Sequence, residues 1–131
     1  MKILCVIDSL GSGGAQRQLV QLAVGFKENG HDVSFLIYHD RCFFKPDLDL
    51  HSINVKIIEE SNFLKRFLKM RKYIRNSDVD GVISFLEAAN FICELSGFPT
   101  RRWRLIVGER SADPRIFNSS KRLFYRWMHV F

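Results

Sequence analysis

A glycine-rich loop is the stretch of this sequence whose residues are best suited to chemistry. Gly11, Gly13 and Gly14 stand between an apolar run from Lys2 to Ile7 and a segment, 15–26, whose apolar residues recur at helical spacing. This order predicts a buried strand, a tight loop and a helix with exposed first amide groups. The positive end of a helix and its free N–H groups attract anions. The loop therefore predicts a site for phosphate or another anion.

Polar residues also follow two later apolar runs, which end at Phe85 and Gly108. In a parallel sheet all strands end at one edge, and ligands bind beyond that edge. We therefore predict that the polar residues after these strands line one site with the glycines. Together with the two that follow the glycine loop, they are Gln16, Arg17, Glu87, Asn90, Glu109 and Arg110.

Three interpretations of the loop can be compared from the residues themselves. The P-loop pattern fails, because no Gly-Lys pair occurs there. The dinucleotide fingerprint begins with Gly11 and Gly13, but its third glycine falls at Gln16. A purely structural turn, in which glycine only lets helix and strand pack closely, is the remaining alternative.

The elements that must position these residues alternate along the chain. Apolar runs predict strands at 2–7, 33–38, 53–58, 81–85 and 104–108, and helical spacing predicts helices at 15–26, 63–75 and 86–96. We expect a mixed loop at 39–52, a loop at 109–117 and a final helix from 118 or 119 onward. Strands that alternate with helices predict a Rossmann-like, doubly wound α/β fold with a mainly parallel sheet of about five strands.

Three segments, each at a strand end, resemble group-1 glycosyltransferases, the retaining enzymes with the two-domain GT-B architecture. They are DSLGSGGAQRQL at 8–19, VISFLEAAN at 82–90 and IVGERSADP at 106–114. The segment GHDVS at 30–34 is similar to the turn before the family's second strand. One departure is that Phe85, Leu86 and Glu87 stand where many relatives have a histidine close to the transferred sugar.

The resemblance implies that residues 1–131 form a single N-terminal, acceptor-side domain. In this family a second domain holds most of the nucleotide-sugar site and a pair of glutamates, so we expect the catalytic residues there and expect the fragment alone to be inactive. The last predicted helix is still apolar at Phe131, which fits a chain that continues. The implied reaction moves a sugar, with retention, from a nucleotide sugar to a saccharide or lipid-linked acceptor, in surface polysaccharide or glycan synthesis. UDP is the nucleotide that we expect.

The implied roles follow from the charge that develops on the leaving diphosphate. The amides of Gly13 and Gly14 would stabilise that charge without a metal or another cofactor. Arg17 and Arg110 would bind phosphate or an anionic acceptor. Substrate binding is also expected of Gln16, Glu87, Asn90 and Glu109, and the glutamates would orient sugar hydroxyls.

Composition and charge narrow the remaining possibilities. The chain has 20 Lys and Arg against 14 Asp and Glu, which favours an anionic partner. Three cysteines lie far apart, and no signal peptide or metal-ligand spacing of His is present, so we expect a cytoplasmic protein without a metal. Nucleic acid is not an expected partner, because the basic, Trp-containing segment 101–104 runs directly into a strand.

A basic helix at 63–75 suggests a membrane contact. Lys65, Arg66, Lys69 and Lys72 lie largely opposite its apolar stripe, so they would rest on anionic headgroups at the inner face of the cell membrane. A solvated charged face is the simpler alternative. For the chain as a whole, the competing functions are a nucleotide- or dinucleotide-binding α/β domain and a non-enzymatic basic module that binds membrane or RNA.

Overall fold

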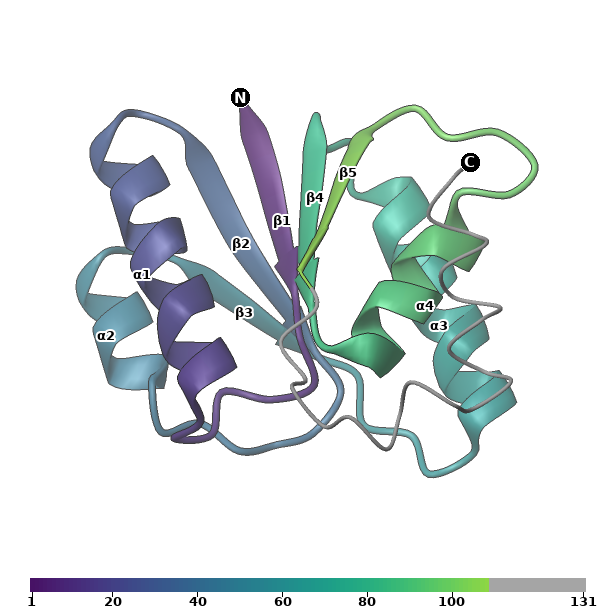
Figure 1. The fold of residues 1–131 in the computed structure, drawn as a ribbon, viewed down its shortest axis with the longest axis horizontal. Coiled ribbons are helices and arrows are strands. Elements are labelled where there is room, and N and C mark those ends of the chain that lie inside the picture. Colours follow the sequence, from purple (N-terminus) through teal and green to yellow (C-terminus); the bar gives the residue numbers. More distant parts are fainter. Residues whose placement is uncertain (109–131) are drawn as a thin grey trace.

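The computed structural model describes residues 1–108 as one open α/β sheet with helices on both faces (Figure 1). In chain order the elements are β1 (Lys2–Val6), α1 (Gly14–Glu28), β2 (Asp32–Ile37), α2 (Lys45–Leu50), β3 (Asn54–Ile57), α3 (Phe63–Asn76), β4 (Gly81–Phe85), α4 (Glu87–Ser96) and β5 (Arg104–Gly108). The predicted loop at 109–117 and the predicted final helix lie outside the described residues.

The sheet is parallel throughout, with the strand order β3-β2-β1-β4-β5. The order reverses at β1, which pairs with β2 on one side and with β4 on the other. In Figure 1, α1 and α2 cover one face of the sheet and α3 and α4 cover the other. The predicted Rossmann-like fold is therefore confirmed. Its crevice for ligands is expected at the carboxyl ends of β1 and β4, where the order reverses.

Side chains of β1 alternate between two hydrophobic cores. Ile3 and Cys5 pack in the core beneath α1 and α2, whereas Leu4 and Val6 pack in the core beneath α3 and α4. A strand between two helical layers has no solvated face, and this explains why residues 2–7 are nearly all apolar. Burial raises the pKa of the Cys5 thiol to about 12, so this cysteine is a packing residue.

Local interactions explain where α3 begins and where α1 ends. Asn62 begins α3 by accepting a hydrogen bond from the Lys65 amide at 3.1 Å. After α1, Gly30 has a φ of +88°, the left-handed conformation expected of a glycine that ends a helix. Both predicted helices are therefore confirmed.

The predicted mixed loop at 39–52 is wrong in part, because it contains α2. This helix has only six residues, with Pro46 near its start and Leu48 as its one buried side chain. A single buried position gives no helical period to detect. Packing of Leu48 into the core beneath α1 and α2 stabilises the helix instead.

Candidate functional site

The loops after β1 and β2 hold one another in place at the carboxyl edge of the sheet. Leu10 donates its backbone N–H to the Arg41 carbonyl at 2.8 Å and accepts from the Phe44 N–H at 3.1 Å. The Leu10 side chain is fully buried in the core beneath α1. These contacts fix the residue that precedes the three glycines, so the glycine loop has a defined position.

Asp8, the second residue after β1, organises the start of that loop. Its backbone carbonyl accepts from the N–H groups of Tyr38 and His39, at 3.1 and 2.9 Å. Its carboxylate accepts from the Ser9 N–H at 2.7 Å and from the Gln16 side-chain amide at 3.0 Å. Asp8 therefore joins β1, the end of β2 and the first turn of α1.

Gln16 lies across Gly13 while it makes this bond. A Cβ placed on Gly13 would overlap Oε1 of Gln16, so glycine lets the Gln16 side chain lie here without moving. Gly13 itself has an extended conformation, with φ −74° and ψ 165°, that any residue adopts. Its glycine is explained by the close approach of Gln16, not by backbone strain.

The first residue of α1, in contrast, faces open space. Among residues 1–108, no atom apart from the adjoining backbone lies within 4 Å of a Cβ built on Gly14, and Gly13 at the N-cap has no side chain to cap the helix. Arg17 is exposed one turn further along the helix. The free amide groups and the arginine can therefore accept an anion that approaches Gly14.

A polar cavity of about 400 Å³ lies beside this loop. The side chains that line it are Asp8, Ser9, His39, Asp40, Arg41 and Glu59. Three of the six are carboxylates, which repel a diphosphate but accept hydrogen bonds from hydroxyl groups. The cavity therefore suits a ligand rich in hydroxyls. These residues were not predicted from the sequence, although His39 and Glu59 follow β2 and β3 within two positions.

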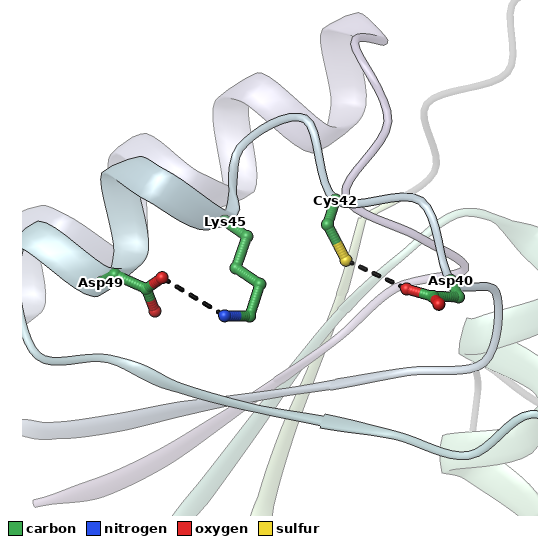
Figure 2. A network of polar contacts seen from close by, with 4 residues as sticks. All are labelled: Asp40, Cys42, Lys45 and Asp49. Atoms are coloured by element: carbon green, nitrogen blue, oxygen red, sulfur yellow. Dashed lines mark hydrogen bonds and ion pairs between the residues drawn. The ribbon is translucent and has the colours of Figure 1, made fainter.

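Two polar contacts lie along the segment after β2 and in α2 (Figure 2). Cys42 donates its thiol to Asp40 at 3.4 Å, and Lys45 pairs with Asp49 at 3.2 Å. Desolvation, and then the hydrogen bond to Asp40 and its charge, raises the pKa of the Cys42 thiol. A raised pKa leaves little thiolate, so Cys42 is not an activated nucleophile.

The turn from β4 into α4 forms the other side of the strand-order reversal. Leu86 has φ +76° and ψ 148°, a conformation that costs a non-glycine residue on the order of 1–3 kcal/mol. Its N–H donates to the Gly108 carbonyl at 3.3 Å, and this bond helps to hold the turn. Glu87 follows as the exposed first residue of α4.

No protein-family model matches this chain. A transferase of Campylobacter jejuni, however, is 31% identical to it over an alignment 140 positions long. That protein is GalNAc-alpha-(1->4)-GalNAc-alpha-(1->3)-diNAcBac-PP-undecaprenol alpha-1,4-N-acetyl-D-galactosaminyltransferase, and the alignment covers 95% of this chain. The chain is homologous to part of a glycosyltransferase.

Two solved structures illustrate the fold that this chain shares with longer proteins. Anabaena HepE in complex with UDP and glucose superimposes with a TM-score of 0.77 at 20% identity, over 98% of this chain. A glycosyltransferase from Rickettsia africae has a TM-score of 0.65 at 20% identity, over 92% of this chain. At that identity the likeness shows the fold alone.

The chain spans 38% of the length of the Campylobacter transferase and 35% of the length of HepE. The predicted relationship to glycosyltransferases is confirmed. The assignment to group 1 and the expected second domain stay predictions.

Four of the site residues predicted for this chain lie together in the glycine loop and at the start of α1. They are Gly13, Gly14, Gln16 and Arg17. The side-chain amide of Gln16, however, donates a hydrogen bond to the Asp8 carboxylate, so this residue positions the loop. Glu109 and Arg110 lie outside the described residues.

The prediction that Asn90 binds substrate is wrong in this structure. Asn90 is 1% exposed. It accepts from the Ser84 hydroxyl at 2.6 Å and donates to the Gly108 carbonyl at 3.1 Å. Its amide therefore ties α4 to β4 and β5, because both of its polar atoms are used inside the protein.

The four basic residues predicted for the membrane contact differ in their surroundings. Arg66 lies over the Tyr38 ring, 4.8 Å from its centroid, and is half-buried. Lys69 pairs with Glu60 at 2.9 Å, and this ion pair lowers the pKa of the Glu60 carboxyl. Lys65 and Lys72 are exposed. Arg66 is therefore a packing residue, which corrects the prediction that it faces outward with the others.

Neither a metal centre nor a membrane span is found in the part of the chain that the structure covers. Across residues 1–108, no three His, Cys, Asp or Glu side chains come together in a way that would hold a metal ion. Within the same residues, no helix has the length and apolar character needed to cross a bilayer.

Proposed function

We propose that this domain belongs to an enzyme that transfers a sugar from a nucleotide sugar to a saccharide or lipid-linked acceptor, in the synthesis of a surface polysaccharide or another glycan. The observation that carries the proposal is the 31% identity to a sugar transferase over 95% of the chain. The site geometry agrees with that chemistry, because an open helix start and a carboxylate-lined cavity lie side by side at Asp8.

The open start of α1 is where we place the diphosphate of the donor. Transfer of the sugar leaves negative charge on that diphosphate, and preorganised N–H groups stabilise such charge. The amides near Gly14 and the exposed guanidinium of Arg17 supply positive potential there without a metal. UDP is the nucleotide that we propose, since HepE was solved with UDP and glucose.

The polar cavity is where we place hydroxyl groups of the acceptor. Asp8, Asp40 and Glu59 can accept hydrogen bonds from sugar hydroxyls, and their charge keeps the diphosphate on the Gly14 side. Glu87, exposed at the start of α4, can bind a further hydroxyl. A lipid-linked acceptor fits best, because the name of the Campylobacter relative includes an undecaprenol-linked glycan.

We also place the enzyme in the cytoplasm, at the inner face of the cell membrane. A lipid-linked acceptor is confined to a membrane, and free cysteines such as Cys5 and Cys93 suit a reducing compartment. The rest of the active site, with the catalytic residues, would come from a second domain. The 131-residue chain alone should therefore transfer no labelled sugar, and turnover by the purified chain would contradict this two-domain proposal.

Gly14→Ala is the variant that tests the diphosphate site. The new methyl group meets no atom of residues 1–108 beyond the adjoining backbone within 4 Å, so stability should be retained, but it projects into the space proposed for the ligand. The backbone N–H is kept, but the methyl group would hold the diphosphate away from it. Loss of one such contact slows a reaction about a hundredfold or more, so transfer by the complete enzyme should fall by about that factor.

Gly25→Ala is the matched control, because Gly25 lies in the same helix and a Cβ there also meets nothing within 4 Å. This variant should fold and transfer sugar like the wild type. If Gly14→Ala is equally active, the diphosphate does not approach α1. If UDP alone protects the chain from heat but no sugar transfer is found in the complete protein, a nucleotide-binding domain without transferase chemistry is the better description.

A further inference from the structure

A buried polar pair joins β4 to α4 among mainly apolar side chains. Ser84 and Asn90 are 0% and 1% exposed, and the Ser84 hydroxyl donates to Oδ1 of Asn90 at 2.6 Å. Buried apolar residues of the same two elements surround the pair in the chain, among them Val82, Ala89 and Ile92. A satisfied polar contact in a core holds one geometry more strictly than apolar packing does. The pair therefore indicates that the start of α4 has to keep a closely defined position.

The pair is also tied to the end of β5. Nδ2 of Asn90 donates to the Gly108 carbonyl at 3.1 Å, and the same carbonyl accepts from the Leu86 N–H at 3.3 Å. The backbone N–H of Asn90 donates to the Leu86 carbonyl at 2.9 Å. A Cβ on Gly108 would overlap the Phe85 ring, so glycine lets β5 lie close against this turn. Asn90 thus holds Leu86 directly and, through Gly108, from its other side.

Leu86 is a residue whose backbone needs such support. Its φ of +76° with ψ 148° is a combination that glycine adopts easily and leucine does not. Its side chain packs against the core beneath α1 and α2, whereas α4 lies on the opposite face of the sheet (Figure 1). The chain therefore crosses the end of the sheet within this turn. If the side chain of Asn90 no longer fixes the Gly108 carbonyl, the turn can relax and α4 starts in a less defined direction.

The Leu86 turn stands beside the glycine loop. Val6 of β1 is the partner of Ser84 of β4 in the sheet, so both chains leave the sheet at the same level, where the strand order reverses. Glu87 follows Leu86 directly and is exposed at the start of α4. The direction of the Glu87 carboxylate thus depends on the conformation of Leu86.

We propose that Ser84 and Asn90 are positioning residues for sugar transfer, which hold the Leu86 turn so that Glu87 accepts a hydrogen bond from a hydroxyl group of the acceptor. A carboxylate that is already held in the right direction loses little freedom on binding, and this strengthens the contact. The inference rests on the proposed function, because Glu87 is assigned a hydroxyl of the same acceptor. It adds that the buried pair, which touches no substrate, acts through Glu87.

A Ser84→Ala, Asn90→Leu double variant removes the pair without leaving a buried polar group unpaired. Leucine has nearly the shape of asparagine, and the Gly108 carbonyl keeps its bond from the Leu86 N–H. Replacement of both polar partners by apolar groups of similar shape is nearly neutral for stability. The double variant should therefore unfold at nearly the same urea concentration as the wild type.

Ser96→Ala is the matched control. Ser96 is also fully buried in α4, and its hydroxyl donates to the Ile92 carbonyl at 2.6 Å, within the same helix. This variant removes a buried hydroxyl from α4 without touching the turn at Leu86. It should keep the properties of the wild type in both measurements below.

The first measurement is hydrogen exchange of the 131-residue chain, without any substrate. The amides of the Leu86 turn and of the first turn of α4 should exchange about tenfold faster in the double variant, because this turn opens locally more often. The amides of β1 and β2 should exchange at the wild-type rate, since the sheet is unchanged.

The second measurement is transfer by the complete enzyme from a labelled UDP-sugar to a lipid-linked saccharide. In the double variant kcat/KM for the acceptor should fall about tenfold to a hundredfold, as expected for a misplaced contact. KM for the donor should stay the same, because we place its diphosphate at Gly14. Glu87→Ala should cause a similar loss, and adding it to the double variant should cause little more, because both changes remove one contact.

Three results would overturn the proposal. One is hydrogen exchange of the turn that the double variant leaves unchanged. Another is a stable double variant with the kcat/KM of the wild type. The third is a loss that is as large in the Glu87→Ala background as in the wild type, because the pair would then act on another group. A wild type that transfers no sugar would refute the proposed function itself, and Ser84 and Asn90 would then have a structural role alone.

Discussion

Gly13→Ala should destabilise the domain by displacing Gln16 from Asp8. The new Cβ would overlap Gln16 Oε1, so the Gln16 side chain must move and its 3.0 Å bond to the Asp8 carboxylate is lost. A hydrogen bond to a charged group contributes about 1.5–3 kcal/mol, and we take about 1–2 kcal/mol because this one is only partly buried. Alanine is also a poorer N-cap than glycine, by about 0.5–1 kcal/mol.

A double-mutant cycle tests whether Gln16 is the reason for this cost. Gly13→Ala alone should lower the free energy of unfolding by about 1.5–3 kcal/mol, and Gln16→Ala alone by about 1–2 kcal/mol. In the Gln16→Ala background the clash is absent, so adding Gly13→Ala should cost only the capping contribution of about 0.5–1 kcal/mol. The two changes should therefore be non-additive by about 1–2 kcal/mol.

Urea denaturation of the wild type and the variants measures these free energies. Gly11→Ala serves as the control, because a Cβ at Gly11 stays 3.4 Å from its nearest atom, the Ser9 hydroxyl oxygen. Its effect should be the same with and without Gln16. If Gly13→Ala costs equally in both backgrounds, Gln16 does not lie across Gly13 and the steric reason for this glycine is refuted.

Three further outcomes are expected. Asn90→Ala should lower the free energy of unfolding by about 3 kcal/mol in urea denaturation, because two internal hydrogen bonds are lost and the buried Ser84 hydroxyl is left without its acceptor. An unchanged urea midpoint would mean that Asn90 does not make these bonds and is available to bind substrate. Arg75→Met should cost about 2 kcal/mol and speed cleavage of the 96–103 segment in limited proteolysis, since the carbonyls that it binds become free. In the native protein at mildly alkaline pH, Cys42 should react slowly with a disulfide reagent. Cys5 and Cys93 should not react, because burial raises their pKa values to about 12. Modification of either buried thiol before the protein unfolds would contradict the packing.

Local patterns were sufficient for the outline of this fold. The strand from Arg104 to Gly108 was predicted from the sequence and is confirmed, and Gly30, which follows α1, has a positive φ. Both depend on a few neighbouring residues: a short run of Leu, Ile and Val favours a strand, and glycine tolerates a positive φ. The glycine loop was found in the same way, because three glycines between an apolar run and a helical pattern mark a tight turn.

The roles of individual side chains depended on neighbours that are distant in the sequence. Asn90 is internal because β5 brings the Gly108 carbonyl beside it, and Arg66 is turned inward by the Tyr38 ring of the segment after β2. Gln16 was predicted to bind substrate, but its amide meets Asp8, eight residues earlier. The periodicity of the sequence does not indicate which of these side chains come into contact.

The same distinction applies to the surfaces. The sequence by itself determined that α3 is amphipathic and basic, since that follows from its 3.6-residue period. Only the tertiary structure decided that Phe63 stays half-exposed at the edge of the core and that Leu64 and Leu68 are exposed on the surface. The reason is that a helical period specifies which side chains share a face, whereas the extent of the sheet beneath that face specifies which of them are buried.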